Sequence, residues 1–313
     1  MKMYRDTRFS LKAKQNLSVL LLVLFFITTG CGGGGKGTDE INVDEDELSQ
    51  DLQELKSDLN STKKIFYSLP SPLETAMLLK SAGARYDEEL LNPVSNTSKY
   101  TTNKKMALNL GIYTTDLSFA SLYDQTQTSI KYMNASKEVA SRLGILDIFS
   151  DTTIKRLEEN VNNRDVIMDI ISETFMNSSS YLVENNRAAI SAIVLIGGWI
   201  EGLHIATSLV NATNFDNNKM VDRIADQKFS LDIVIKLIEK YSYHEDVASL
   251  LVTMKEVKDI YDKIEIRTTK IEPMKDESNN VTTLKSSSKI SITPEVFNEL
   301  TLKIKTIRKS FVS

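Results

Sequence analysis

The sequence predicts an all-α protein folded as a multi-helix bundle, on the basis of three observations. The chain has 313 residues, of which 41% are hydrophobic and 26% charged, a composition that suits one sizeable globular core. No proline lies between residues 94 and 272, although proline interrupts helices more strongly than any other residue. Towards both ends of the chain, apolar residues repeat at alternating spacings of three and four, which is the heptad pattern of packed helices.

Residues 1–30 have the pattern of an export signal. Five basic residues precede an apolar run at residues 17–27, and the small residues Thr28, Thr29 and Gly30 follow. The run is too short to span a bilayer, which takes about 20 residues. The next residue, Cys31, is the only cysteine of the chain.

Thr29, Gly30 and Cys31 match the last three positions of a lipobox, with Thr28 where leucine is usual. Residues 1–31 therefore resemble the signal peptides of bacterial lipoproteins. The resemblance implies that Cys31 becomes the first residue of the mature chain, carries a thioether-linked diacylglycerol, and has its amine acylated, for example with palmitate. In that family, aspartate after the cysteine usually marks retention at the inner membrane. Because Gly32 follows Cys31 here, the resemblance favours a location at the outer membrane, on its periplasmic or surface face. The alternative is an ordinary secretory signal with a chance cysteine near its cleavage site.

The charge of the mature chain limits its partners. Loss of residues 1–30 removes five basic residues and one acidic residue, which leaves 33 basic and 41 acidic residues and a net charge of −8. Such a chain is repelled by nucleic acid and by anionic membrane surfaces, so we expect no nucleic-acid partner and a membrane link only through the N-terminal lipid. With one cysteine, an internal disulfide is excluded.

The mature chain divides by composition into four parts. Residues 31–45 form a glycine-rich, acidic tether, 46–265 a helical domain, 266–292 a polar linker and 293–313 an amphipathic C-terminal helix. Within the linker, Ile264 and Ile266 on one side and Ile290 and Ile292 on the other allow a short strand pair. Beyond the N-terminal helix, we predict helices near residues 72–82, 103–123, 126–143, 151–161, 165–184, 187–211, 217–241 and 245–265.

The two terminal helices have matching patterns. The N-terminal one carries an apolar seam at Leu48, Leu52, Leu55, Leu59, Thr62 and Phe66, with acidic residues outside it. The C-terminal one begins with Thr293 as cap and Pro294 as first helical residue. Its seam consists of Phe297, Leu300, Ile304, Ile307 and Phe311, with the basic residues Lys303, Lys305, Arg308 and Lys309 outside it. We therefore expect the two helices to pack against each other or close together.

The central stretch, residues 188–210, contains the only tryptophan, Trp199, and one of two histidines, His204. Its charge-free part ends after thirteen residues at Glu201, which favours a buried helix over a membrane span. Gly198 and Gly202 lie four residues apart and form a ridge along which another helix could approach closely.

Two pairs of segments suggest an internal duplication of about residues 103–166 and 187–247. Residues 111–121 align with 197–207 at an offset of 86, with Gly111/Gly197, Leu117/Leu203 and Ala120/Ala206 identical. Residues 157–166 align with 238–247 at an offset of 81. Chance similarity between amphipathic helices is the alternative. If the duplication is real, the two central helices should pack together near a pseudo-twofold axis.

Glu201 and His204 are the candidate polar site. Their three-residue spacing is half of the metal motif of ferritin-like di-iron bundles. The chain has no second Glu-x-x-His, and the aligned copy has Thr115 and Ser118 instead, so we expect no metal but a structural hydrogen bond or a ligand contact. No serine-nucleophile elbow, phosphate-binding loop or dinucleotide fingerprint occurs, so we expect neither catalytic residues nor a cofactor.

Two functions remain open on the sequence. In the first, the chain is a non-catalytic, lipid-anchored envelope protein with a structural or protein-interaction role, and its partner is another envelope protein. In the second, it binds a small molecule in a pocket between the duplicated helices, lined by Tyr113, Trp199, Glu201 and His204. A cavity between those helices favours the second function, and a solid core with an exposed apolar patch favours the first.

Overall fold

The computed structural model describes residues 72–145, 151–160, 163–210, 215, 218–268, 272–276, 281–285 and 288–313. All of them belong to one of two compact units of the chain, Leu52–Ser313. The export signal, Cys31, the tether and the predicted helix at residues 48–66 lie outside the described residues. The predicted packing of the two terminal helices therefore stays a prediction.

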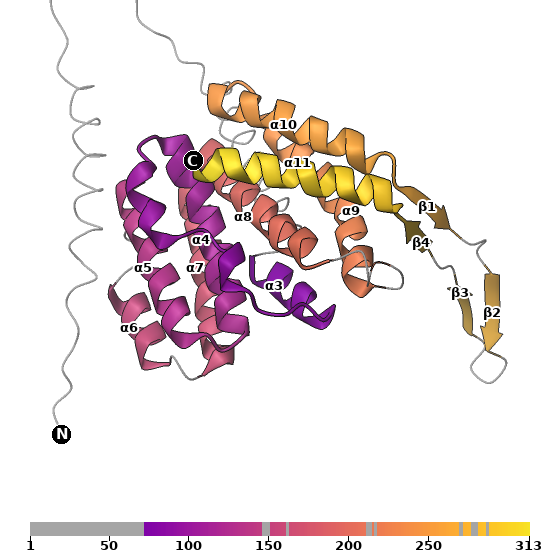
Figure 1. Cartoon of the computed structure of the whole chain (residues 1–313), viewed down its shortest axis with the longest axis horizontal. Helices are drawn as coiled ribbons and strands as arrows, with labels where there is room; N and C mark the ends of the chain where they lie inside the picture. The colour runs from indigo at the N-terminus through magenta and orange to yellow at the C-terminus, as the bar shows by residue number, and fades with distance from the viewer. Residues whose placement is uncertain are drawn as a thin grey trace, which may run out of the picture. The chain divides into compact units, whose positions relative to one another are not determined.

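The all-α prediction is confirmed, and the observed helix ends differ from the predicted ones by no more than four residues. The helices are α3 (Pro72–Ser81), α4 (Asn103–Leu122), α5 (Thr126–Arg142), α6 (Asp151–Glu159), α7 (Arg164–Glu184), α8 (Ala188–Leu209), α9 (Lys219–Lys240), α10 (Glu245–Tyr261) and α11 (Pro294–Val312) (Figure 1). Between α3 and α4 the chain forms two 3-10 turns, η1 (Glu88–Leu90) and η2 (Val94–Lys99).

Side chains bind free backbone groups at the ends of several helices. At N-termini, the Thr102 and Thr293 hydroxyls accept hydrogen bonds from the backbone N–H groups of Lys105 and Val296, as predicted for Thr293. At C-termini, Lys80 donates to the Leu122 carbonyl at 2.6 Å. Cations at these carbonyls also compensate the negative end of the helix dipole, so each such contact both ends a helix and ties it to a neighbour.

Helices α4 and α8 form the centre of the bundle. Every residue from Met106 to Leu122 is buried, and so is every residue from Ala189 to Leu203. A helix buried on all sides has no solvent-facing polar side, which explains why α8 is apolar over most of its length. Among the described residues, α8 is the one helix that is long and apolar enough to cross a membrane. However, 89% of its apolar 18-residue window is buried inside the structure. The prediction of a buried helix is confirmed.

The backbones of α4 and α8 touch at two glycines. A Cβ atom added to Gly111 would lie 2.0 Å from the carbonyl oxygen of Val194, and one added to Gly197 would lie 2.0 Å from that of Leu108. No side chain fits at either position, so glycine is required by the close approach itself. The prediction that these helices pack together is confirmed (Figure 1).

This contact is reciprocal. Gly111 and Gly197 are 86 positions apart, and so are Leu108 and Val194, the residues whose carbonyl oxygens they meet. Exchange of the two helices therefore leaves the contact unchanged, as in an interface between identical subunits related by a twofold axis. This is the arrangement expected for the two central helices of a duplicated unit, while the common origin of the two segments stays a prediction.

The helix ends agree with the second predicted offset. Helix α6 ends at Glu159 and α9 at Lys240, and the caps of the next helices are Asn163 and His244. Both pairs are 81 positions apart. The aligned residues of segments 157–166 and 238–247 thus lie in the same structural feature, the end of one helix followed by the start of the next.

The C-terminal helix α11 packs on α8, α10 and α4. All five residues of its predicted seam are buried, at 6% exposure or less. Burial of five large apolar side chains from one helix makes α11 an integral part of the core, since each contributes about 1.5 to 3 kcal/mol.

Residues between α10 and α11 form two strand pairs. Strand β1 (Glu265–Thr268) pairs with β4 (Ser288–Ser291), with Ile266 opposite Ile290, which confirms the predicted pair. Strand β2 (Glu272–Asp276) pairs with β3 (Val281–Lys285), which the sequence analysis did not predict. Pro273 is tolerated in β2 because a two-stranded ribbon has only edge strands. The strands lie beyond the ends of α10 and α11 (Figure 1).

We expect Gly111→Ala and Gly197→Ala each to lower the free energy of unfolding by about 3 kcal/mol, because the added methyl group overlaps a carbonyl oxygen and the helices must separate. Gly198→Ala is the matched control, since its added carbon lies 3.1 Å from the Thr115 hydroxyl and meets no backbone atom closer than 3.3 Å. Its loss should be below about 1 kcal/mol, because alanine also favours the helix by about that amount. Urea unfolding measures all three, and equal losses would contradict the backbone contact.

Candidate functional site

The four residues predicted to line a pocket do not face one common space. Tyr113 is fully buried, and its hydroxyl donates to the Pro93 carbonyl at 3.1 Å. Trp199 faces other elements, with its ring 6.4 Å from that of Tyr261 and its Nε1 donating to Gln227 at 3.3 Å. Between these two residues the backbones of α4 and α8 are in contact, so the two aromatic side chains belong to separate parts of the core.

Glu201 has a different partner from the one expected. Its carboxylate is fully buried and accepts two hydrogen bonds from Arg308 of α11, from Nε and Nη2, both at 3.0 Å. This bidentate arrangement is the strong form of an ion pair. The Arg308 Nη2 also donates to the Leu90 carbonyl at 3.3 Å. The structural role expected for Glu201 is thus filled by Arg308 and not by His204.

His204 lies beside this ion pair and is half-buried. Burial lowers the pKa of its imidazole below the usual value, while the negative charge of Glu201 acts in the opposite direction and the positive charge of Arg308 adds to the effect of burial. The backbone of Leu90 acts on this pKa in the same direction as Glu201. Because the pKa is lowered overall, His204 is uncharged at neutral pH.

A second carboxyl group faces Glu201. Asp116 of α4 is fully buried, and its Oδ2 accepts a hydrogen bond from the backbone N–H of Asn92 at 3.1 Å. Burial, and then the negative charge of Glu201, raise the pKa of Asp116 well above its usual value, although the positive charge of Arg308 lowers it. One guanidinium can neutralise one carboxylate, so beside the Arg308–Glu201 ion pair this dry interior favours the uncharged form of Asp116. We call Asp116, Glu201 and Arg308 the carboxyl cluster.

Amide and hydroxyl groups extend this cluster. The Asn92 side chain donates to the Tyr100 hydroxyl at 2.9 Å and to the Asn109 side chain at 3.1 Å. Asn109 in turn donates to the carbonyl of Phe311 at 2.8 Å. The C-terminal half of α11 is thus bound to α4 and α8 by Arg308 and by the Phe311 carbonyl, and the segment before α4 closes the cluster from a third side.

The sequence contained signals for the two residues that were missed. Asp116 is the only charged residue in the buried part of α4, residues 106–122. Arg308 lies four positions after Ile304 and three before Phe311, so it shares their face of α11 instead of lying outside the seam. A charged residue at a core position requires a buried partner. Asp116 and Arg308 are therefore the residues to consider as neighbours of the buried Glu201.

No group of three or more His, Cys, Asp or Glu side chains in the described part of the chain is arranged to hold a metal ion. Comparison with protein-family models, curated proteins and solved structures finds no match for this chain. The site must be interpreted from its own geometry.

We expect Arg308→Met to lower the free energy of unfolding by about 3 to 5 kcal/mol, because it leaves the Glu201 carboxylate buried without its partner. The double variant Glu201→Gln/Arg308→Met removes both charges and should lose less than Arg308→Met alone. Denaturant unfolding of the two single variants and the double variant measures the coupling. Strictly additive losses would show that the ion pair does not hold α11.

Proposed function

We propose that this chain is a lipid-anchored protein of the bacterial cell envelope that acts by binding another envelope protein and not by catalysis. The lipobox at residues 29–31 and the following tether support the anchor. The outer membrane is the favoured location, because glycine and not aspartate follows Cys31.

A groove on the outer side of α10 and α11 is the observation that carries the interaction role. It is shallow and open to solvent, has a volume of about 440 Å³, and is lined by Glu256, Asp259, Ile260, Lys263, Glu299, Leu302, Lys303 and Thr306. Leu302 is 67% exposed at its wall. Val252, 61% exposed, lies one helical turn before Glu256 on the same face of α10. These are the two most exposed aliphatic side chains among the described residues, and they lie on adjacent helices.

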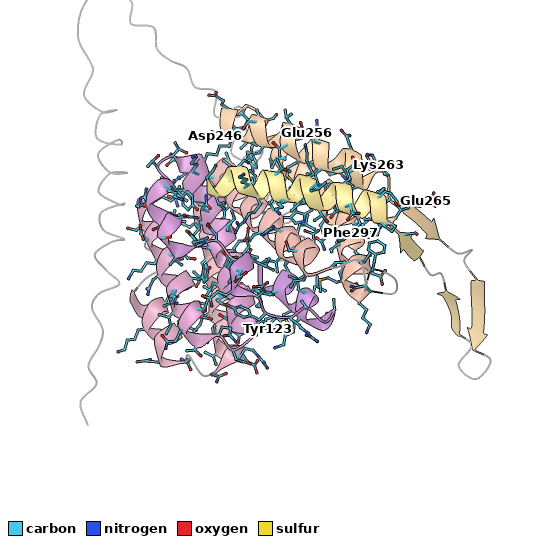
Figure 2. All side chains as sticks on the ribbon, in the orientation of Figure 1. Tyr123, Asp246, Glu256, Lys263, Glu265 and Phe297 are labelled. Carbon is cyan, nitrogen blue, oxygen red and sulfur yellow. The ribbon has the colours of Figure 1, made fainter. Side chains whose placement is uncertain are left out.

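Charged pairs cross this outer groove. Lys303 contacts Glu256 at 2.6 Å, and Lys263, two residues after the end of α10, contacts Glu299 at 2.6 Å. Figure 2 labels Glu256 and Lys263, the two members of these pairs that do not belong to α11. Exposed ion pairs contribute little to stability, about 0 to 1 kcal/mol, but they fix side chains around the apolar residues. An apolar centre with a charged rim is the usual anatomy of a protein–protein interface.

The small-molecule alternative receives less support. Trp199 lines a cleft with Leu79, Gly202, Leu203 and Gln227, but the cleft encloses only about 30 Å³. That volume suits one or two water molecules and no metabolite. The helices expected to enclose a pocket are instead in backbone contact at Gly111 and Gly197.

A photo-crosslinking residue placed at Leu302 or Val252 should form a specific adduct with another envelope protein in cells, because both side chains project into the proposed interface. The matched control is Lys131, which is exposed on α5, a helix that packs on α4 and η2. Adducts at Leu302 and Val252, absent at Lys131 and competed by wild-type chain, are the expected result. Equal adducts at all three positions would contradict a specific surface.

For the anchor, we expect Cys31→Ser to abolish incorporation of a palmitate analogue and to leave the protein unprocessed or mislocalised, because thioether formation requires sulfur. Metabolic labelling followed by membrane fractionation measures both effects. Ser313→Cys provides a control for labelling at an unrelated thiol. Undiminished label in Cys31→Ser would contradict lipidation at this residue.

A further inference from the structure

A cleft between α4, α5 and α7 belongs neither to the carboxyl cluster nor to the outer groove. It has a volume of about 30 Å³, and its wall combines apolar side chains with hydroxyl groups, among them those of Thr114, Ser136, Thr174 and Ser178. We call it the hydroxyl cleft. No charged side chain of the described residues lines it, so an ion would lose its hydration there without compensation. By size and lining, the hydroxyl cleft suits a small neutral molecule.

Ser136 of α5 is a buried hydroxyl without a partner in the protein. Its side chain is 1% exposed, and its Oγ forms no hydrogen bond with any of the described residues. Serine inside a helix commonly donates to the carbonyl four residues earlier, but Ser136 does not, and it lines the cleft instead. Because an unsatisfied buried hydroxyl is costly, such groups are normally bonded to the protein or to ordered water. Ser136 therefore indicates that a molecule with an acceptor atom lies in the cleft.

The hydroxyl groups of α4 and α7 present the opposite half of a hydrogen-bonding site. Each donates its proton to the carbonyl four residues earlier in its own helix, at 2.7 Å for Thr114 and Thr174 and at 2.8 Å for Ser178. Their protons are thus used, but each oxygen keeps a lone pair that can accept. The cleft offers one free donor, from Ser136, and several acceptors. A water molecule, which can accept from Ser136 and donate twice, complements this set.

We propose that the hydroxyl cleft binds one or two water molecules, which are held by Ser136 on one side and by the hydroxyl oxygens of α4 and α7 on the other. The volume agrees with this number, because one bound water needs about 10 to 15 Å³. A larger hydroxylated ligand, such as a sugar, does not fit into about 30 Å³.

Bound water at this place joins two helices that otherwise have little contact. Within the described residues, α5 and α7 each pack on α4 but only marginally on each other. Their side chains face each other across the cleft, with Met133 and Ser136 from α5 and Thr174 and Ser178 from α7. A water molecule between two polar groups binds them nearly as well as a direct hydrogen bond. The bound water therefore replaces direct packing between α5 and α7.

The sign of a serine-to-alanine effect on stability tests the proposal. Ser136→Ala takes away the donor to the bound water and should lower the folding equilibrium constant of the mature chain about threefold. Ser191→Ala on α8 is the matched control. Ser191 is also 1% exposed, and its Oγ also has no partner among the described residues, but it lines neither the hydroxyl cleft, the Trp199 cleft nor the outer groove.

The control variant removes an unpaired hydroxyl, so its folding constant should rise above that of the wild type. Both variants gain the helix propensity of alanine, so the opposite signs report on the hydroxyl groups. Urea unfolding measures both constants. A folding constant in Ser136→Ala equal to or above that of the wild type would overturn the proposal.

Magnetic relaxation dispersion of the water signal detects long-lived bound water directly. Ser136→Val replaces the hydroxyl with two methyl groups, which cannot donate and which take up space in the cleft. We expect a lower dispersion amplitude in Ser136→Val than in the wild type, and an unchanged amplitude in Ser191→Ala. Equal amplitudes in the wild type and Ser136→Val would overturn the proposal even if Ser136→Ala lowers stability.

Discussion

The direct contact between the backbones of α4 and α8 is the constraint on which the rest of the structure depends. Because Gly111 and Gly197 leave no room for side chains between the helices, the two backbones are fixed relative to each other without freedom to slide. Asp116 follows Gly111 by five residues and Glu201 follows Gly197 by four, about one turn further along each helix. The backbone contact at Gly111 and Gly197 thus excludes a pocket between α4 and α8. One turn further along, it brings the carboxyl groups of Asp116 and Glu201 close to each other.

A buried pair of carboxyl groups makes the C-terminal helix specific to its position. Apolar burial of the α11 seam provides most of the attraction, but a seam alone can slip by one heptad. Arg308 prevents this, because any other register would leave Glu201 uncompensated in the core. The hydrogen bond from Asn109 to the Phe311 carbonyl fixes the same helix one turn later. We therefore attribute the position of α11 mainly to its polar contacts, and its contribution to stability mainly to its apolar contacts.

What could be predicted from the sequence follows from the range of the interactions involved. Helix positions, the Thr293 cap and the buried α8 depend on local periodicity and were predicted correctly. The prediction of His204 as the partner of Glu201 was wrong. The actual partner, Arg308, is 107 residues away, and no local pattern connects the two. The convergence of Tyr113 and Trp199 was expected from their aligned positions, but alignment does not give the direction in which a side chain points. Strands β2 and β3 were missed because their few apolar residues do not alternate with polar ones: Pro273 and Met274 are adjacent in β2, and Val281 and Leu284 are three positions apart in β3.

Helix α11 borders both the carboxyl cluster and the outer groove, through opposite faces. Ile304 and Arg308 face α8 and the carboxyl cluster, whereas Leu302 and Thr306 face the outer groove. A helix that detaches from its C-terminal end removes the wall of the groove around Thr306 first, while Lys263 and Glu299 still join α10 to the beginning of α11. Partner binding across the groove would in turn favour the docked helix, since a ligand stabilises the state that it binds better.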